Sequence, residues 1–392
     1  MFTVFTCITP ILREATQALG HRDAGDAWPG ADGRQLARRA LCRSLGRPDA
    51  DRHAGSAGSD PRGLRSADVV IRDGRRDTAA TAFLDPVRSR PNLAVVTGAL
   101  ALRLFVSRTG CDGVEVAIGN RSVHVAAAET ILSAGAIDSP RLLMLSGVGD
   151  PDALAVHGIK PVAAVPGVGR SLQDHPLMAG LCFSARRPVP ASHYNHCETM
   201  VIASSGSSRG SANLQLMALS VPFLLPDIGP PPPNAFSIVP ALMQPRSVGT
   251  LTLASADPCA AGVIDPNYLA EESDVATLVE AVELARAIVA DKAMADWVAT
   301  EVYPGSSVHG AALAAHIRRS ASPFFHPVST CRMGRADDPF AVVDPQCRVK
   351  GVARLRVVDA SVFPSIPQAM TNAATLALAE RAADLIRGRV AA

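Results

Sequence analysis

Two polar residues near the C-terminus have types and surroundings suited to proton transfer. His326 lies in FFHPVSTCRMG, where the following proline keeps it out of helical geometry and the neighbouring aromatic residues predict a dry cavity. An imidazole with a pKa near its ordinary value can accept or share the proton of a hydroxyl group at neutral pH. A histidine in a His-Pro pair is more often a structural residue, and that alternative stays open.

Asn372 lies 46 residues after His326, in AMTNAATLALAERAADLIRG. The alanine and leucine run predicts a helix that begins at this asparagine and continues to Gly388. An amide at that place can donate a hydrogen bond to a substrate oxygen, and the helix N-terminus favours negative charge in front of it. The alternative is that Asn372 only caps the helix.

Two further segments predict places where a ligand approaches the backbone. In TILSAGAIDSPRLLMLSGVG, Ala134 and Gly135 end a buried strand without a large side chain, and Ser139-Pro140 predicts the start of a helix. In LRVVDAS, Asp359 follows another strand. Taken alone, the first segment is a well-capped helix and the second is a strand that ends in an Asx turn.

Charge and cysteine usage exclude several classes of function. Lys and Arg total 38 against 36 for Asp and Glu, which leaves no basic surplus for nucleic acid or an anionic membrane. The eight cysteines form no C-x-x-C pair, and His193, His196 and Cys197 lack a fourth ligand, so we predict no metal site. No apolar run is long enough to span a membrane, and MFTVFTCITPIL lacks a basic n-region. These features predict a cytoplasmic protein.

The elements that must position these residues form two groups. The first group contains strands built on Leu93, Val95 and Val96 and on Leu102, Leu104 and Val106, then strands over 113–118, 124–126 and 129–134, and a helix from Pro140 to Leu145. The second contains strands over 212–219, 237–243 and 250–254 and a helix from Asp274 to Lys292, whose buried face carries Leu278, Ala281, Val282 and Ala285. A short helix over Pro10–Leu19 is also predicted, whereas IGPPPP at 228–233 is a loop.

Three segments together resemble the glucose-methanol-choline (GMC) oxidoreductase family, and its choline dehydrogenase-like members in particular. They are GAIDSPRLLMLSGVG, HPVSTCRMG and LRVVDASVFPSIPQAMTNAATLALAERAADLI. The resemblance implies FAD as cofactor, a small-molecule alcohol as substrate, and hydride transfer to the flavin. It implies that His326 and Asn372 are catalytic and that Asp174 and His175 are structural. It implies cofactor contacts at these positions: Leu104, Ala134, Gly135, Asp359, Ala360, Ala373 and Ala374.

The implied fold class is α/β, with a partial Rossmann-like FAD-binding domain and an α+β substrate-binding domain whose sheet is backed by helices. We expect the FAD-binding domain over 66–175 and 330–392 and the substrate-binding domain over 176–329. We assign no domain to residues 1–65, which the composition predicts to be degraded or disordered. Ser329 stands where the family usually has glycine.

The sequence departs from the family pattern at the diphosphate. It contains no G-x-G-x-x-G, the loop whose backbone amides hold a dinucleotide pyrophosphate; GVGDPD at Gly147 and GVGRSL at Gly167 lack the third glycine. We therefore expect an N-terminally incomplete member. Two alternatives remain: an inactive remnant that does not hold FAD, and a two-chain enzyme whose glycine loop comes from another polypeptide. The sequence identifies neither the alcohol nor the electron acceptor.

Overall fold

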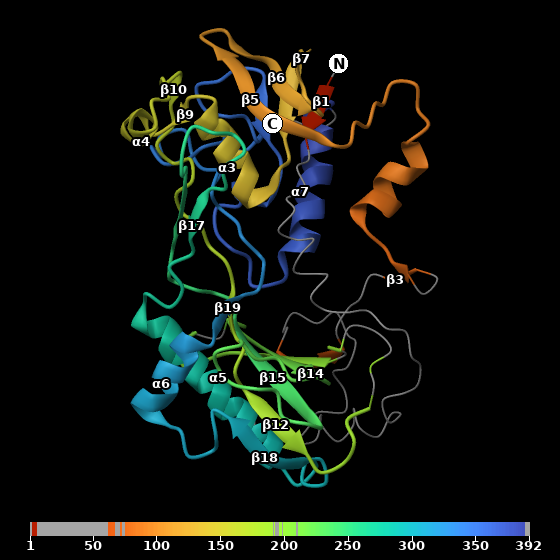
Figure 1. Cartoon of the computed structure of the whole chain (residues 1–392), viewed down its shortest axis with the longest axis vertical. Helices are drawn as coiled ribbons and strands as arrows, with labels where there is room; N and C mark the ends of the chain where they lie inside the picture. The colour runs from red at the N-terminus through yellow and green to blue at the C-terminus, as the bar shows by residue number, and fades with distance from the viewer. Residues whose placement is uncertain are drawn as a thin grey trace.

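The computed structural model describes residues 2–5, 62–66, 71–72, 75–190, 192, 196–197, 199–208 and 211–388. The expected helix over Pro10–Leu19, most of the segment 1–65 and His193 lie outside these residues. The chain forms two lobes, one above the other in Figure 1, and α7 runs from the junction toward the far end of the upper lobe. None of the helices in the described residues is long and apolar enough to cross a membrane.

The upper lobe is built on two three-stranded sheets. One is parallel, in the order β1 (Phe2–Phe5), β8 (Glu129–Leu132), β20 (Leu355–Val357), and the other is an antiparallel meander of β5 (Ala99–Ser107), β6 (Gly110–Ile118) and β7 (Arg121–Ala126). The lobe also contains α3 (Gly135–Leu145), α4 (Pro151–Val156), η4 (Ala360–Val362), α7 (Thr371–Ile386), β9 (Val148–Gly149) and β10 (Ala163–Ala164). Apolar residues of the meander, α3 and β20 share one core, which includes Val114, Leu132, Leu143 and Val357.

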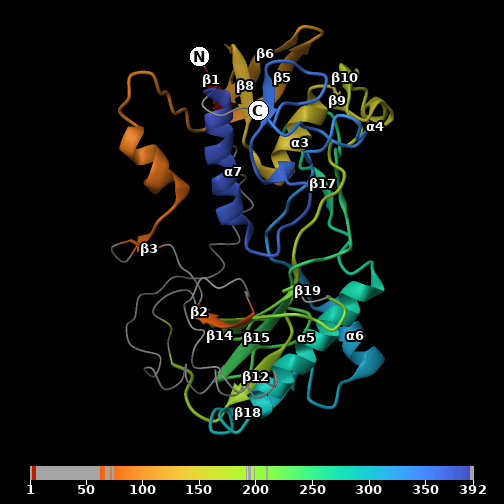
Figure 2. The same ribbon diagram turned by 180° about the vertical axis from the view of Figure 1, so that it is seen from behind.

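Two sequence predictions for this lobe are wrong. The segment around Leu93, Val95 and Val96 forms no strand, and these three side chains are exposed. It belongs to an arm with η2 (Ala80–Leu84), η3 (Asp85–Val87), β3 (Ile71–Arg72) and β4 (Arg75–Arg76) that stands off the body in Figures 1 and 2. The second is the start of α3, which begins at Gly135, so that Pro140 lies inside the helix. Proline removes the hydrogen bond to the carbonyl four residues earlier, that of Ala136, and this carbonyl accepts instead from the Thr330 hydroxyl at 2.6 Å.

The lower lobe is an eight-stranded sheet whose main path runs β18 (Val298–Tyr303), β12 (Cys182–Ala185), β15 (Ala235–Leu242), β14 (Leu214–Leu219), β13 (Thr199–Ala203), β2 (Gly63–Ser66). Two short strands join it at β15: β11 (Pro176–Met178) and, through β11, β19 (Ala321–Pro323). Helices α5 (Glu272–Ala290) and α6 (Gly310–Arg319) cover one face of this sheet, and a β16–β17 hairpin (Thr250–Thr252, Val263–Asp265) extends toward the upper lobe. The predicted buried face of α5 is confirmed, because its four named residues are fully buried.

The two faces of this sheet carry different cores. Leu214, Leu216 and Leu242 pack against α5 and α6. The opposite face, here called the second face, carries a smaller cluster of Leu177, Ala179, Met217, Val239, Ala241 and Met243. Sheets backed by helices, in a mixed α/β molecule, are the architecture that the sequence predicted.

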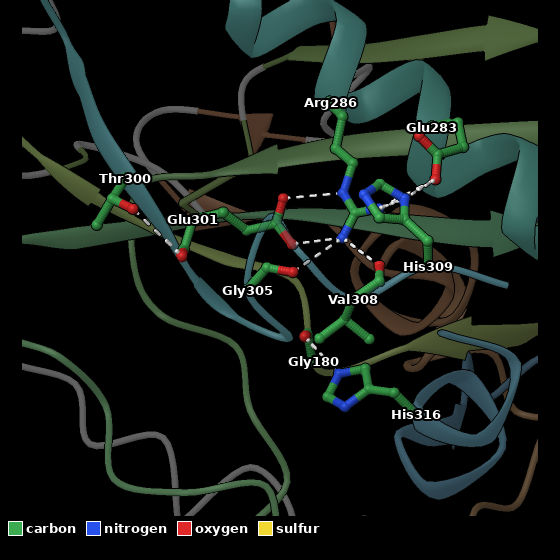
Figure 3. Close-up of polar contacts among 9 residues, drawn as sticks. All are labelled: Gly180, Glu283, Arg286, Thr300, Glu301, Gly305, Val308, His309 and His316. Carbon is green, nitrogen blue, oxygen red and sulfur yellow. Dashed lines mark hydrogen bonds and ion pairs between the residues drawn. The ribbon is translucent and has the colours of Figure 1, made fainter. Parts of the chain in front are cut away.

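A buried ion pair joins α5 to β18 on the helix-covered side (Figure 3). Arg286 donates to both carboxylate oxygens of Glu301, from Nε at 2.9 Å and from Nη2 at 2.8 Å, and Nη2 also reaches the carbonyls of Gly305 and Val308. The side chains of Arg286 and Glu301 are only 12% and 4% exposed, so water screens the pair little. The guanidinium therefore connects the loop before α6 to the C-terminal part of α5 by hydrogen bonds.

Candidate active site

His326 lies at the junction of the lobes and is held through its backbone. Its N–H donates to Asp174 Oδ1 at 2.8 Å, and the other oxygen of Asp174 accepts from the Tyr268 hydroxyl at 2.5 Å. Burial raises the pKa of Asp174, and burial beside that carboxylate raises the pKa of the Tyr268 phenol. The sequence offered no signal for Tyr268, which lies 94 residues from Asp174.

The imidazole of His326 meets a second imidazole. Its Nδ1 lies 3.0 Å from Nδ1 of His175, and the two rings are nearly perpendicular at 88°. His175 Nε2 lies 3.0 Å from the carbonyl oxygen of Pro367, in the loop that leads into α7. The structure thus brings His175, which the resemblance implied to be structural and flavin-adjacent but not catalytic, into direct contact with the predicted base.

This chain of contacts determines which nitrogen carries each proton. A carbonyl oxygen only accepts, so His175 Nε2 must be the protonated nitrogen and its Nδ1 a free acceptor. His326 Nδ1 must then carry a hydrogen, which it donates to His175 Nδ1. The Nε2 of neutral His326 is consequently left with its lone pair, which is the state that a proton acceptor needs.

The environment of the pair keeps both rings neutral. Burial lowers the pKa of His326 to about 4, and burial together with the neighbouring His326 lowers the pKa of His175 to about 4. The expectation of an ordinary pKa for His326 is therefore wrong, because the imidazolium would be poorly solvated at this place. Of the two flanking aromatic residues, Phe324 packs on the His326 ring at a centroid distance of 4.4 Å, whereas Phe325 is 65% exposed.

Asn372 is the second residue of α7 and is exposed. The cap of this helix is Met370, which offers no side-chain hydrogen bond, so the capping interpretation of Asn372 does not hold. Within the described residues the Asn372 amide has no hydrogen-bond partner, and it is not joined directly to His326. His326 contacts His175, and His175 contacts the carbonyl oxygen of Pro367, which lies five residues before Asn372 in the sequence. The convergence of His326 and Asn372 on one substrate oxygen stays a prediction.

The residues predicted to contact the cofactor fall into a buried frame and a set of small, accessible positions. Asp359 is buried and accepts from Gly135 N–H at 3.0 Å, Ser139 Oγ at 2.6 Å and Ser361 N–H at 2.8 Å. Its carboxylate is fully used in tying the N-terminus of α3 to η4. Asp359 is thus a positioning residue, and contacts to a ligand at this point would come from the backbone.

The small positions around that frame leave room for a ligand. Gly135 has a φ of +83°, and no atom lies within 4 Å of the place where its side chain would project. Four alanines share this partly or fully accessible character: Ala134, Ala360, Ala373 and Ala374. Small residues beside open space, facing a helix N-terminus without a side-chain cap, fit the ring end of a flavin. At the diphosphate end, the sequence after β1 reads TCITP, without glycine.

Leu104 lies away from this group. It is buried, its backbone N–H donates to Ser146 Oγ at 2.8 Å, and it lines a cavity of about 570 Å³ with Arg103, Glu115 and Lys160. None of the histidines at the lobe junction lines that cavity, so it is separate from the proton-transfer site. The predicted adenine contact at Leu104 stays a prediction.

Comparisons with known proteins identify the family and the fold. Two family models, both described as GMC oxidoreductase, match residues 9–177 and 245–379. The chain is 37% identical to mitochondrial choline dehydrogenase of Mus musculus over 85% of this chain and 60% of that protein, and 36% identical to choline oxidase of Arthrobacter globiformis over 80% and 59%. It therefore spans about 60% of the length of these relatives. The solved pyridoxine 4-oxidase of Mesorbium loti superposes with a TM-score of 0.84, at 34% identity over 94% of this chain and 71% of that one.

Proposed function

The chain belongs to the GMC oxidoreductase family, whose members are FAD-dependent flavoproteins, and from this we propose that it oxidises the CH–OH group of an alcohol with FAD as cofactor. The observation that carries the proposal is the His175–His326 pair, which leaves a neutral imidazole nitrogen free at the lobe junction. Relatives named choline dehydrogenase, choline oxidase and alcohol dehydrogenase support the alcohol class.

We propose the following roles for the protein groups. His326 Nε2 takes the proton of the substrate hydroxyl, because its lone pair is free and its Nδ1–H is already bound to His175. The exposed amide of Asn372 donates to the same oxygen as negative charge develops on it, and the N-terminus of α7 adds a favourable field. When bound, FAD supplies the acceptor for the hydride that leaves the carbinol carbon.

The flavin end of FAD would be held by Ala134, Gly135 and Ala360 and, in the first turn of α7, by Ala373 and Ala374. Asp359 keeps Gly135 and η4 in place for this contact. We also propose a cytoplasmic location, which the free cysteines of the described residues support.

The test is turnover of a panel of primary alcohols by the chain in the presence of added FAD and an artificial electron acceptor. His326→Ala should lower kcat by roughly two or more orders of magnitude, the scale of a lost general base, while FAD affinity stays unchanged. His309→Ala is the matched control, because His309 is an exposed histidine in the Arg286 cluster, away from the site. Equal kcat for His326→Ala and the wild type would show that the histidine is structural.

A further inference from the structure

Two polar side chains of β14 and β15 lie on the otherwise apolar second face of the lower sheet: Ser237, whose Oγ accepts a hydrogen bond from the N–H of Phe223, and Gln215. Gln215 is 4% exposed, and its Nε2 has no hydrogen-bond partner among the described residues. Its neighbours Ile202, Met217, Val239 and Ala241 offer only hydrocarbon and sulfur, and the amide of Asn213, two residues before it, is already bound to Ser205. A buried amide donor without an acceptor costs free energy, so a residue of this kind points to a partner that arrives from outside the protein.

Strand register places Gln215 on the same face as the histidine pair. Gln215 pairs with Ala241 on β15, and Ala241 pairs with Leu177 on β11, so the three side chains lie in one row across the sheet. Leu177 is two residues after His175 and therefore points to the same side. Two strand spacings separate Gln215 from Leu177, which is about 10 Å between their Cα atoms.

The part of the second face between these two ends is one buried apolar cluster. Met243 belongs to the cluster of the second face, and its backbone acts on His175. Phe324 packs against the same cluster and contacts the His326 ring at an interplanar angle of 32°. Three methionines also contribute to this surface, Met200, Met217 and Met243, and their flexible side chains adapt to ligands of different shape.

We infer that Gln215 determines substrate specificity by donating a hydrogen bond to a second polar group of the alcohol. The substrate class is a neutral alcohol with an apolar body, whose hydroxyl reaches His326 and whose far end carries an acceptor such as an ether or carbonyl oxygen. This inference rests on the proposed function for the position of the hydroxyl group. The Gln215 contact itself concerns binding, so it can be tested without turnover.

The test compares two probes of equal length that differ in one acceptor atom, 6-methoxyhexan-1-ol and octan-1-ol. Binding to the full chain with added FAD is measured by isothermal titration calorimetry. The wild type should bind the ether alcohol about tenfold more tightly, the scale of one hydrogen bond made by an otherwise unpaired buried donor. Gln215→Met should abolish this difference and raise the Tm of the ligand-free protein, because methionine fills the same space without an unpaired amide.

Gln244→Met is the matched control, since Gln244 is an exposed glutamine one residue beyond Met243. It should retain the tenfold preference. The inference is overturned if Gln215→Met keeps the preference of the wild type or if neither probe binds. It is also overturned if the wild type shows no preference, which is the result expected when water is the partner of Gln215. If the preference behaves as expected but no alcohol is oxidised, the proposed function fails and the role of Gln215 in binding stands.

Discussion

The two imidazoles at the lobe junction act as one unit at the residue scale. The carbonyl of Pro367 fixes the proton on His175, and His175 fixes the proton on His326. A backbone carbonyl in the loop before α7 thus sets the protonation state of His326, the proposed catalytic base. A loop movement that broke this contact would remove the preference for a free Nε2 on His326.

The depressed pKa values of the pair make stability depend on pH. Both folded-state values are about 4, below the ordinary 6.5, so between these limits the unfolded chain binds more protons than the folded one. The free energy of unfolding should fall as the pH drops from about 6.5 to about 4, by a few kcal/mol for the pair, and level off below.

The variant His175→Phe removes one of the two groups, so its unfolding free energy should decline less steeply over the same pH range. The measurement is urea unfolding of wild type and variant at intervals between pH 7 and pH 4. Because each protein is compared with itself at pH 7, the cost of the substitution cancels. Parallel curves for the two proteins would show that His175 is not buried in a neutral state.

Ser329 carries a different kind of local cost. It is fully buried, has a φ of +72°, and its hydroxyl has no partner among the described residues. Left-handed backbone costs a residue with a Cβ about 1–2 kcal/mol, and glycine avoids that cost at some expense in unfolded-state entropy. Ser329→Gly should therefore raise the free energy of unfolding by about 1 kcal/mol.

The comparison for that prediction is Ser329→Ala, which removes the hydroxyl but keeps the Cβ. In denaturant unfolding it should be less stable than Ser329→Gly. If alanine stabilises as much as glycine, the unpaired hydroxyl and not the backbone is the source of the cost.

At the scale of elements, two pairs of segments join the lobes. Gln173 and Val328 exchange backbone hydrogen bonds at 3.2 and 2.9 Å, and β11 pairs with β19 beside them. His175 and His326 sit on these paired segments, which explains how residues 151 positions apart meet. Short antiparallel pairing of this kind holds the two rings at a fixed separation, as proton transfer requires.

The Arg286–Glu301 pair is a buried ion pair that joins α5 to β18 in the lower lobe. Removing one partner leaves a poorly solvated charge, so Arg286→Met should cost about 3 kcal/mol or more. The double variant Arg286→Met with Glu301→Leu removes both charges and should be more stable than Arg286→Met alone. Denaturant unfolding of both single variants and the double variant measures the coupling. Losses that simply add would show that the two side chains do not interact.

On the scale of the whole molecule, small accessible positions are available for the proposed flavin end, whereas the sequence contains no recognisable diphosphate loop. Phosphates depend on backbone amides and a helix terminus, and the sequence offers no G-x-G-x-x-G for this purpose. We expect the purified chain to be colourless or to lose FAD on gel filtration. Absorbance of the eluted protein at flavin wavelengths measures this. Stoichiometric, retained flavin would show that another segment holds the diphosphate.

Much of the local structure follows from the sequence alone. The apolar spacing of α5 predicted its buried face, the alanine-rich run predicted α7, and the alternation in 113–118 predicted a strand, because side-chain periodicity reports burial directly. The family motifs located His326 and Asp359. The failed strand at Leu93, Val95 and Val96 shows the limit of that signal, since apolar residues in an exposed arm have the same composition as a strand.

The tertiary structure alone decided how these residues act on one another. Nothing in the local sequence joins Asp174 to Tyr268, His175 to Pro367, or Asp359 to Gly135, because each pair is brought together by strand pairing and lobe packing over long separations. The pKa of His326 followed the same rule: its residue type suggested an ordinary value, and burial lowered it to about 4. The sequence therefore determined which groups are present, whereas packing determined their charge state, their proton positions and which of them meet.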